Sequence, residues 1–224
     1  MRRRILSMSW LIVLGCSDST PEGQSAGKQP PMTVERQFWE WFVLNSAELA
    51  TVKTGKERVC SELDKLLTNV EKGLTWEFGP SVEGVREFTI SADGNKELFP
   101  RVKKLAAAAP VLPKWKVHAL RQRRIIRAMT LTIDGDTVKA EDMRVLVVPE
   151  GAKVGVTVYV PGLKDSNKKR AMEQGFLLLD FALGEEDMEL RVSSIDFLPL
   201  PDAEKARDLK PFTELAVVFD ALRK

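Results

Sequence analysis

The sequence predicts an α+β fold with a mixed β-sheet, and three observations support this prediction. Alternating apolar residues indicate short strands, apolar residues at three- and four-residue spacing indicate helices, and the order strand, strand, helix, strand occurs twice. The first set of elements starts at residues 74, 85, 96 and 115, and the second starts near 144, 154, 167 and 190. The nearly constant offset predicts two β-β-α-β pattern repeats, over residues 74–120 and 144–198.

The first repeat opens with a β-hairpin. Apolar and polar residues alternate over Leu74–Phe78 and again over Phe88–Ala92, and Gly79-Pro80 interrupts the run between them. A helix with Pro100 in its first turn follows, and then a strand at Trp115–Leu120. A helix that joins two strands of one sheet makes a right-handed parallel crossover in nearly all proteins, so we expect the third strand to run parallel to the second.

The second repeat follows an Asp-Gly hairpin at Ile133–Asp136. Its helix is expected to begin at a Ser166 cap and to end at Gly184. The apolar phase shifts within the last strand, Leu190–Leu198, which predicts a bulge at Ser193-Ser194. The two strands before the helix are expected at Val145–Val148 and Val154–Val160.

Two N-terminal helices and a C-terminal helix are expected to pack on the sheet. Thr33 can cap the first helix, Gly73 can end the second, and Pro211 opens the last. The apolar arc of the first helix is wide. Either the fold covers both flanks of that helix, or Trp39 is an exposed docking residue.

The N-terminus combines a basic segment, Met1–Arg4, with a ten-residue apolar run, Ile5–Leu14, too short to span a bilayer. The run leads into Val-Leu-Gly-Cys at residues 13–16. This segment resembles the lipobox of bacterial lipoproteins. The resemblance implies that residues 1–15 are a signal peptide, cut before Cys16, and that the Cys16 thiol carries a diacylglycerol and palmitate-like membrane anchor. The alternative is an ordinary cleaved signal peptide or an uncleaved anchor.

The expected lipoprotein would have a flexible tether and one folded domain. Residues 16–32 hold the lipidated cysteine and a stretch rich in Ser, Pro, Gly and Gln, and a single domain would span residues 33–224. Such a protein would be anchored in the bacterial cell envelope and face the periplasm. Ser17, where an Asp would suggest inner-membrane retention, favours the outer membrane. Cys60 would then be the one free thiol, and its helical position favours a buried small hydrophobe over a reactive group.

Composition excludes several classes of function. Without Arg2, Arg3 and Arg4 the chain has 31 basic and 32 acidic residues, so net charge gives no support to nucleic-acid binding. With one histidine and two cysteines, His-rich and paired Cys-x-x-Cys metal sites are impossible. The sequence also contains no G-x-S-x-G, P-loop, dinucleotide or EF-hand motif, and we expect no cofactor and no metal.

One group of titratable residues could support acid/base chemistry. If Trp76 pairs with Phe88, Glu77 lies opposite Glu87 on the other face of the hairpin. The next strand would turn Lys116 and His118 towards both glutamates, and paired carboxylates beside a cation suit a hydrolase. The alternative is an ordinary solvated sheet face with salt bridges.

A second group is basic and follows the third strand. Four guanidinium groups within seven residues could bind phosphate, lipid headgroups or lipopolysaccharide beside the membrane. The alternative is a loop that pairs with the acidic run at residues 185–187. The four residues are Arg121, Arg123, Arg124 and Arg127.

Five segments together resemble a family of uncharacterised bacterial proteins. They are FWEWF at 38–42, LTWEFGP at 74–80, REFTISADG at 86–94, AP-x-LP-x-W at 109–115 and LDFALGEED at 179–187. The resemblance spans most of the chain after Thr33 and implies a single domain, but it implies no activity. We therefore expect a lipid-anchored envelope protein that binds a protein, a peptide or another envelope component. The alternative is an acid/base hydrolase built on Glu77, Glu87 and His118.

Overall fold

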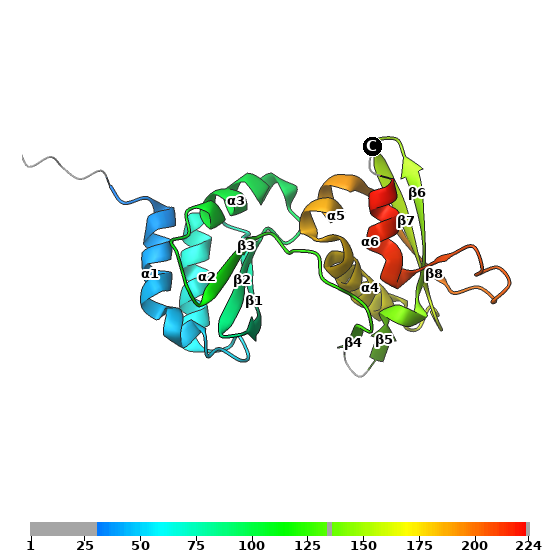
Figure 1. The fold of residues 1–224 in the computed structure, drawn as a ribbon, viewed down its shortest axis with the longest axis horizontal. Helices are drawn as coiled ribbons and strands as arrows, with labels where there is room; N and C mark the ends of the chain where they lie inside the picture. Colours follow the sequence, from blue (N-terminus) through cyan, green and yellow to red (C-terminus); the bar gives the residue numbers. More distant parts are fainter. Residues whose placement is uncertain (1–30, 134–135, 223–224) are drawn as a thin grey trace, which may run out of the picture. The chain divides into compact units, whose positions relative to one another are not determined.

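The computed structural model describes residues 31–133 and 136–222, which contain two β-β-α-β units (Figure 1). The first unit follows two helices and has a short 3₁₀ turn before its own helix. Its elements are α1 (Val34–Leu49), α2 (Arg58–Val70), β1 (Thr75–Val82), β2 (Val85–Ser91), the turn η1 (Lys96–Leu98), α3 (Phe99–Ala107) and β3 (Trp115–Ala119).

The second unit begins after a small hairpin and ends in a C-terminal helix. Together with that hairpin, the elements of this part of the chain are β4 (Thr130–Ile133), β5 (Asp136–Lys139), the turn η2 (Ala140–Asp142), β6 (Arg144–Glu150), β7 (Lys153–Val160), α4 (Lys168–Leu183), α5 (Glu185–Arg191), β8 (Val192–Pro199), β9 (Lys210–Pro211), the turn η3 (Phe212–Glu214) and α6 (Leu215–Ala221).

The two units have the same strand arrangement. The first strand of each unit is antiparallel to the second, and the second is parallel to the third, as β1-β2-β3 and β6-β7-β8. The α+β class, the repeated order and the parallel crossover are therefore confirmed. The strands of the two units do not join one sheet, however, because β1-β2-β3 and β8-β7-β6-β9 are separate.

Separate sheets go with separate hydrophobic cores. One core contains residues of α1, α2, α3 and the first sheet, and the other contains residues of α4, α6 and the second sheet. Each sheet thus has helices of its own to bury its apolar face, and neither needs the other sheet for this purpose. Residues Met32–Lys224 nevertheless form one compact unit, and their description as one domain stays a prediction.

An aromatic cluster fixes α1 on the first sheet. The ring of Phe42 lies 4.7 Å from that of Phe88 and 5.1 Å from that of Trp115, measured between centroids. Trp39 is only 3% exposed and its indole N–H donates a 2.8 Å hydrogen bond to the carbonyl of Leu105. The interpretation of Trp39 as an exposed docking residue is therefore wrong, and the core interpretation is confirmed.

Local signals in the sequence place most element ends. The Thr33 side chain accepts a hydrogen bond from the backbone N–H of Arg36, as expected of a helix cap. A register shift in the β7–β8 ladder leaves Ser193 without a pairing residue on β7, which confirms the bulge. Ser166 is not the cap of α4, because Asn167 occupies that position.

The predicted last strand begins too early. Residues up to Arg191 belong to the helix α5, and β8 starts at Val192.

Cys60 is buried, and burial raises the pKa of its thiol, as a packing role requires. Cys16, the signal peptide and most of the tether lie outside the described residues. Among the described helices, none combines the length and apolar character needed to cross a membrane.

Candidate functional site

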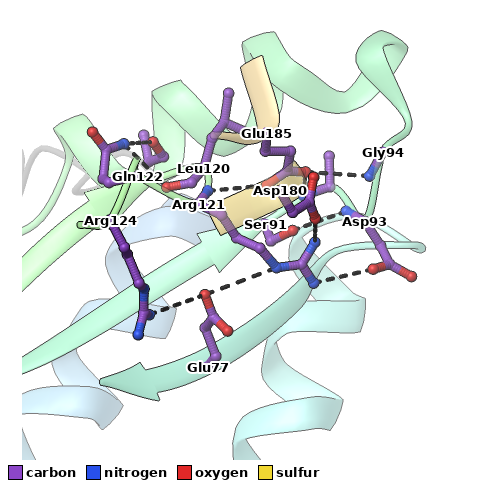
Figure 2. Close-up of polar contacts among 12 residues, drawn as sticks. Glu77, Ser91, Asp93, Gly94, Leu120, Arg121, Gln122, Arg124, Asp180 and Glu185 are labelled. Carbon is purple, nitrogen blue, oxygen red and sulfur yellow. Dashed lines mark hydrogen bonds and ion pairs between the residues drawn. The ribbon is translucent and has the colours of Figure 1, made fainter. Parts of the chain in front are cut away.

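A buried carboxylate connects three segments that are distant in the sequence (Figure 2). Glu185, the first residue of α5, is 1% exposed. Its Oε1 accepts hydrogen bonds from the backbone N–H groups of Ala92 at 2.9 Å and Gly94 at 3.3 Å, and its Oε2 accepts one from Arg121 at 3.0 Å. The carboxylate thereby holds the loop after β2 and the segment after β3 against the start of α5.

Gly184 allows the chain to reach this position. It ends α4 with a φ of 75°, a conformation that disfavours residues with a side chain. A Cβ at Gly184 would lie 3.1 Å from the carbonyl oxygen of Arg121 and 3.2 Å from the backbone nitrogen of Arg123. The close approach lets the backbone N–H of Glu185 donate a 3.0 Å hydrogen bond to the carbonyl of Arg121.

The guanidinium of Arg121 is surrounded by carboxylates. It lies 3.1 Å from Asp93, 3.5 Å from Asp180 and 3.8 Å from Glu77. Burial alone would lower the pKa of Arg121, but the hydrogen bond that it donates to Asp93 and the charges of Glu185, Glu77 and Asp180 raise it overall. Arg121 therefore stays charged and serves as the shared counter-ion of several acids.

Two acids near Arg121 hold their protons more tightly than usual. Burial raises the pKa of Asp180 to about 6; Arg121 opposes this shift, and the charges of Glu185, Glu189 and Glu77 add to it. Burial and the charge of Glu185 also raise the pKa of Glu189. Carboxyl groups with raised pKa values are characteristic of functional sites, although ion-pair networks also produce them.

A cavity of about 720 Å³, here named the α4–α5 groove, opens beside this network. One part of its lining is charged and another part is apolar. Phe176 and Leu177 on α4 are 41% and 42% exposed. The lining consists of Asp93, Gly94, Arg121, Glu173, Phe176, Leu177, Asp180, Met188, Glu189, Val192, Ser193, Ser194 and Ile195.

The predicted acid/base group is only partly brought together. Trp76 pairs with Ile90, not Phe88, because the β1–β2 register differs from the expected one by two residues. Glu77 therefore lies opposite Thr89, and the predicted pairing of Glu77 with Glu87 is wrong. A register irregularity between Phe78 and Ser81, around Gly79-Pro80, allows this pairing.

The rest of that group stays together. Glu87 Oε1 lies 3.2 Å from His118 Nε2, and Lys116 is the β3 partner of Glu87 in the parallel ladder. Glu77 instead lies 3.8 Å from both Arg121 and Arg124. The structure thus gives one carboxylate–imidazole pair and one separate carboxylate–arginine group.

Three of the four predicted basic residues take part in internal contacts. Arg123 pairs with Asp187 and Asp220 and donates a hydrogen bond to the carbonyl of Leu183, and the two aspartates raise its pKa. Arg124 lies over the ring of Phe181 at 5.2 Å. The pairing of this segment with the acidic run is therefore present at Asp187. Arg127 is exposed, and a role in anion binding stays a prediction for it.

The carboxylates at the centre of this site are not predicted as site residues by the sequence. Glu185 lies in the acidic run at residues 185–187, which the sequence indicates only as a pairing partner for the arginine-rich loop, and no motif marks Asp93, Asp180 or Glu189. One signal was available: Gly184 followed by three acids is typical of a helix end and the first turn of a new helix. The partners of Glu185 are backbone N–H groups, which a sequence does not distinguish.

No group of three or more His, Cys, Asp or Glu side chains in the described part of the chain is placed to hold a metal ion. No protein-family model matches the chain, and no curated protein or solved structure matches it significantly.

Proposed function

We propose that the chain is a lipid-anchored protein of the bacterial cell envelope, attached through Cys16 and facing the periplasm. Its folded part binds another envelope component, a protein or a peptide, and catalyses no reaction. The lipobox at residues 13–16 supports the anchor, and Ser17 favours the outer membrane. Placement at a membrane face suits a protein whose task is to hold a partner there.

The α4–α5 groove is the observation that carries the binding proposal. Ligand sites are concave and combine apolar side chains with a few polar groups, and this groove has both kinds of lining. Exposed Phe176 and Leu177 provide apolar area that a bound partner could cover. By contrast, Arg121, Arg123 and Arg124 are engaged by acids of the same chain, which argues against an anionic headgroup as their main ligand.

Site-specific photo-crosslinking in native envelopes tests this proposal. A photo-reactive amino acid replaces Phe176 in the full-length protein, and the control replaces Val217, which is 71% exposed on α6 and does not line the groove. We expect a discrete crosslinked product from position 176 and none of that size from position 217. Identical products from both positions, or none from position 176, would contradict binding in the groove.

A hydrolase is the second candidate, and the 3.2 Å contact between Glu87 and His118 favours it, because a carboxylate can orient an imidazole base. The other carboxylate of the predicted group, Glu77, lies 3.8 Å from both Arg121 and Arg124 and is opposite Thr89, so it is not paired with Glu87. Turnover of model esters, glycosides or phosphoesters that disappears in the His118→Asn variant would support the hydrolase. Equal rates in the wild type and the variant would exclude His118 as its base.

A further inference from the structure

The α4–α5 groove carries an excess of negative charge that identifies its ligand class. Its lining contains four carboxylates, those of Asp93, Glu173, Asp180 and Glu189, and one guanidinium, that of Arg121. Building on the proposed binding function, we infer that the groove binds a cationic amphipathic peptide segment, in which lysine or arginine alternates with large apolar side chains.

Within the groove, the guanidinium of Arg121 is already engaged by acids. Asp93 and Asp180 lie within 3.5 Å of this guanidinium, and the backbone N–H of Arg121 donates a hydrogen bond to Glu185. Glu173 is exposed, and Glu189 is half-buried beside the loop after β2, where a Cβ on Gly94 would lie 3.0 Å from Glu189 Oε1. These two glutamates and Asp93, whose side chain is 66% exposed beside Arg121, are the carboxylates that a ligand's cation can approach.

Three other charged side chains act on Glu189. Lys96 and Lys153 act on Glu189 from nearby and favour its ionised form, but neither lines the groove. Glu185 acts in the opposite sense, and burial has a larger effect than any of the three. A cation placed in the groove would replace lost hydration at Glu189 by direct charge pairing.

The apolar part of the lining explains why the ligand should be amphipathic. The ring of Phe176 packs edge-to-face on Phe197 of β8, with centroids 5.1 Å apart, so the exposed phenyl is held in place. Leu177, Met188 and Ile195 line the groove beside it. Lysine and arginine lay their aliphatic stems on such surfaces while their charged heads reach carboxylates, and the face of Phe176 also attracts a cation.

Peptide binding to the full-length lipidated protein in detergent micelles tests the inference. The probe is a fluorescein-labelled peptide of alternating lysine and leucine, and the comparison probe has glutamate in place of each lysine. We expect the lysine peptide to raise the fluorescence polarisation saturably and the glutamate peptide to give no saturable change. Equal binding of the two peptides would overturn the inference.

Matched variants locate the binding on the protein. Glu189→Gln should lower the affinity for the lysine peptide by about fivefold, which is the effect of removing one charge pair from a partly desolvated contact. Glu204→Gln removes the same charge from an exposed loop outside the groove and should leave the affinity unchanged. Unaltered circular dichroism spectra would verify that both variants are folded, and equal affinities for the two variants would refute the assignment to the groove.

The outcomes also separate this inference from the proposed function. A crosslinked product from position 176 in envelopes, without binding of the lysine peptide, would mean that the groove binds a ligand of different charge. In that case the inference fails and the binding function stands. No crosslinked product from position 176 and no peptide binding would remove both.

Discussion

Replacing Glu185 by glutamine should weaken the connection between the two β-β-α-β units, because the three backbone N–H groups it binds have no substitute acceptor of equal charge. The carboxylate is 1% exposed and accepts hydrogen bonds from Ala92, Gly94 and Arg121 at 2.9 to 3.3 Å. Glutamine keeps the shape of the side chain but replaces one oxygen by an NH₂ donor.

The magnitude follows from the contacts that are lost. If the amide oxygen stays on Ala92 and Gly94, the NH₂ group meets the N–H of Arg121, so one charge-assisted hydrogen bond is lost and a buried donor has no acceptor. Each of these effects is worth roughly 1 to 3 kcal/mol. Together they lead us to expect that Glu185→Gln lowers the free energy of unfolding by about 2 to 6 kcal/mol.

Urea unfolding of the full-length protein measures this change, and the neighbouring residue provides the control. Glu186 pairs with Lys103 at 2.6 Å, but both side chains are about half exposed, so Glu186→Gln should cost less than about 1 kcal/mol. Hydrogen exchange should also accelerate at the amide of Arg121 in the Glu185 variant, because that N–H loses its acceptor. If both variants had the same stability, the structural role assigned to Glu185 would be refuted.

Three further predictions concern charge, packing and the anchor. Folding raises the pKa of Asp180 from 3.8 to about 6, so the ionised form of this residue disfavours folding. Asp180→Asn should therefore stabilise the protein at pH 8 by at most about 3 kcal/mol, and the gain should vanish as the pH falls below 4. A loss of stability in this variant at pH 8 would contradict the prediction. A Cβ on Gly175 would overlap the ring of Phe197, so Gly175→Ala should destabilise the protein by about 1 to 3 kcal/mol in urea unfolding, although the same change in an open helix stabilises. A gain in stability would show that Phe197 moves freely. Cys16→Ala should move the protein from the membrane fraction to the soluble periplasmic fraction, with the wild-type intact mass showing the lipid, and equal membrane fractions would exclude the anchor.

Much of the fold could be predicted because it depends on local signals. Thr33 caps α1 through its own side chain, and the phase shift at Ser193 marks a bulge wherever the strand pairs. The parallel pairing of β2 with β3 follows from the general handedness of crossovers. These features need only a few neighbouring residues or a rule common to all sheets.

The predictions that are wrong concern features that depend on long-range geometry. The β1–β2 register is set by the irregularity after Phe78, and a shift by two residues keeps every side chain on its predicted face. The alternation of apolar and polar residues is therefore compatible with both pairings, that of Trp76 with Ile90 and that of Trp76 with Phe88. Periodicity also does not show that each unit has enough helices to bury its own sheet, so the sequence predicts one mixed sheet where the structure has a separate sheet in each unit.

The candidate site was the least predictable part. Its central acid, Glu185, binds main-chain N–H groups more than 60 residues away, and no side-chain pattern encodes such contacts. The arginines were found from the sequence, but their partners, such as Asp220 for Arg123, come from elements that only the fold brings near.

The most direct test of groove binding is an NMR titration of the ¹⁵N-labelled lipidated protein in micelles with the lysine–leucine peptide. We expect saturable shifts of the backbone amides of Gly94, Phe176, Leu177 and Ser193–Ile195. Shifts confined to the strands that carry Glu87 and His118, with the groove amides unchanged, would contradict groove binding.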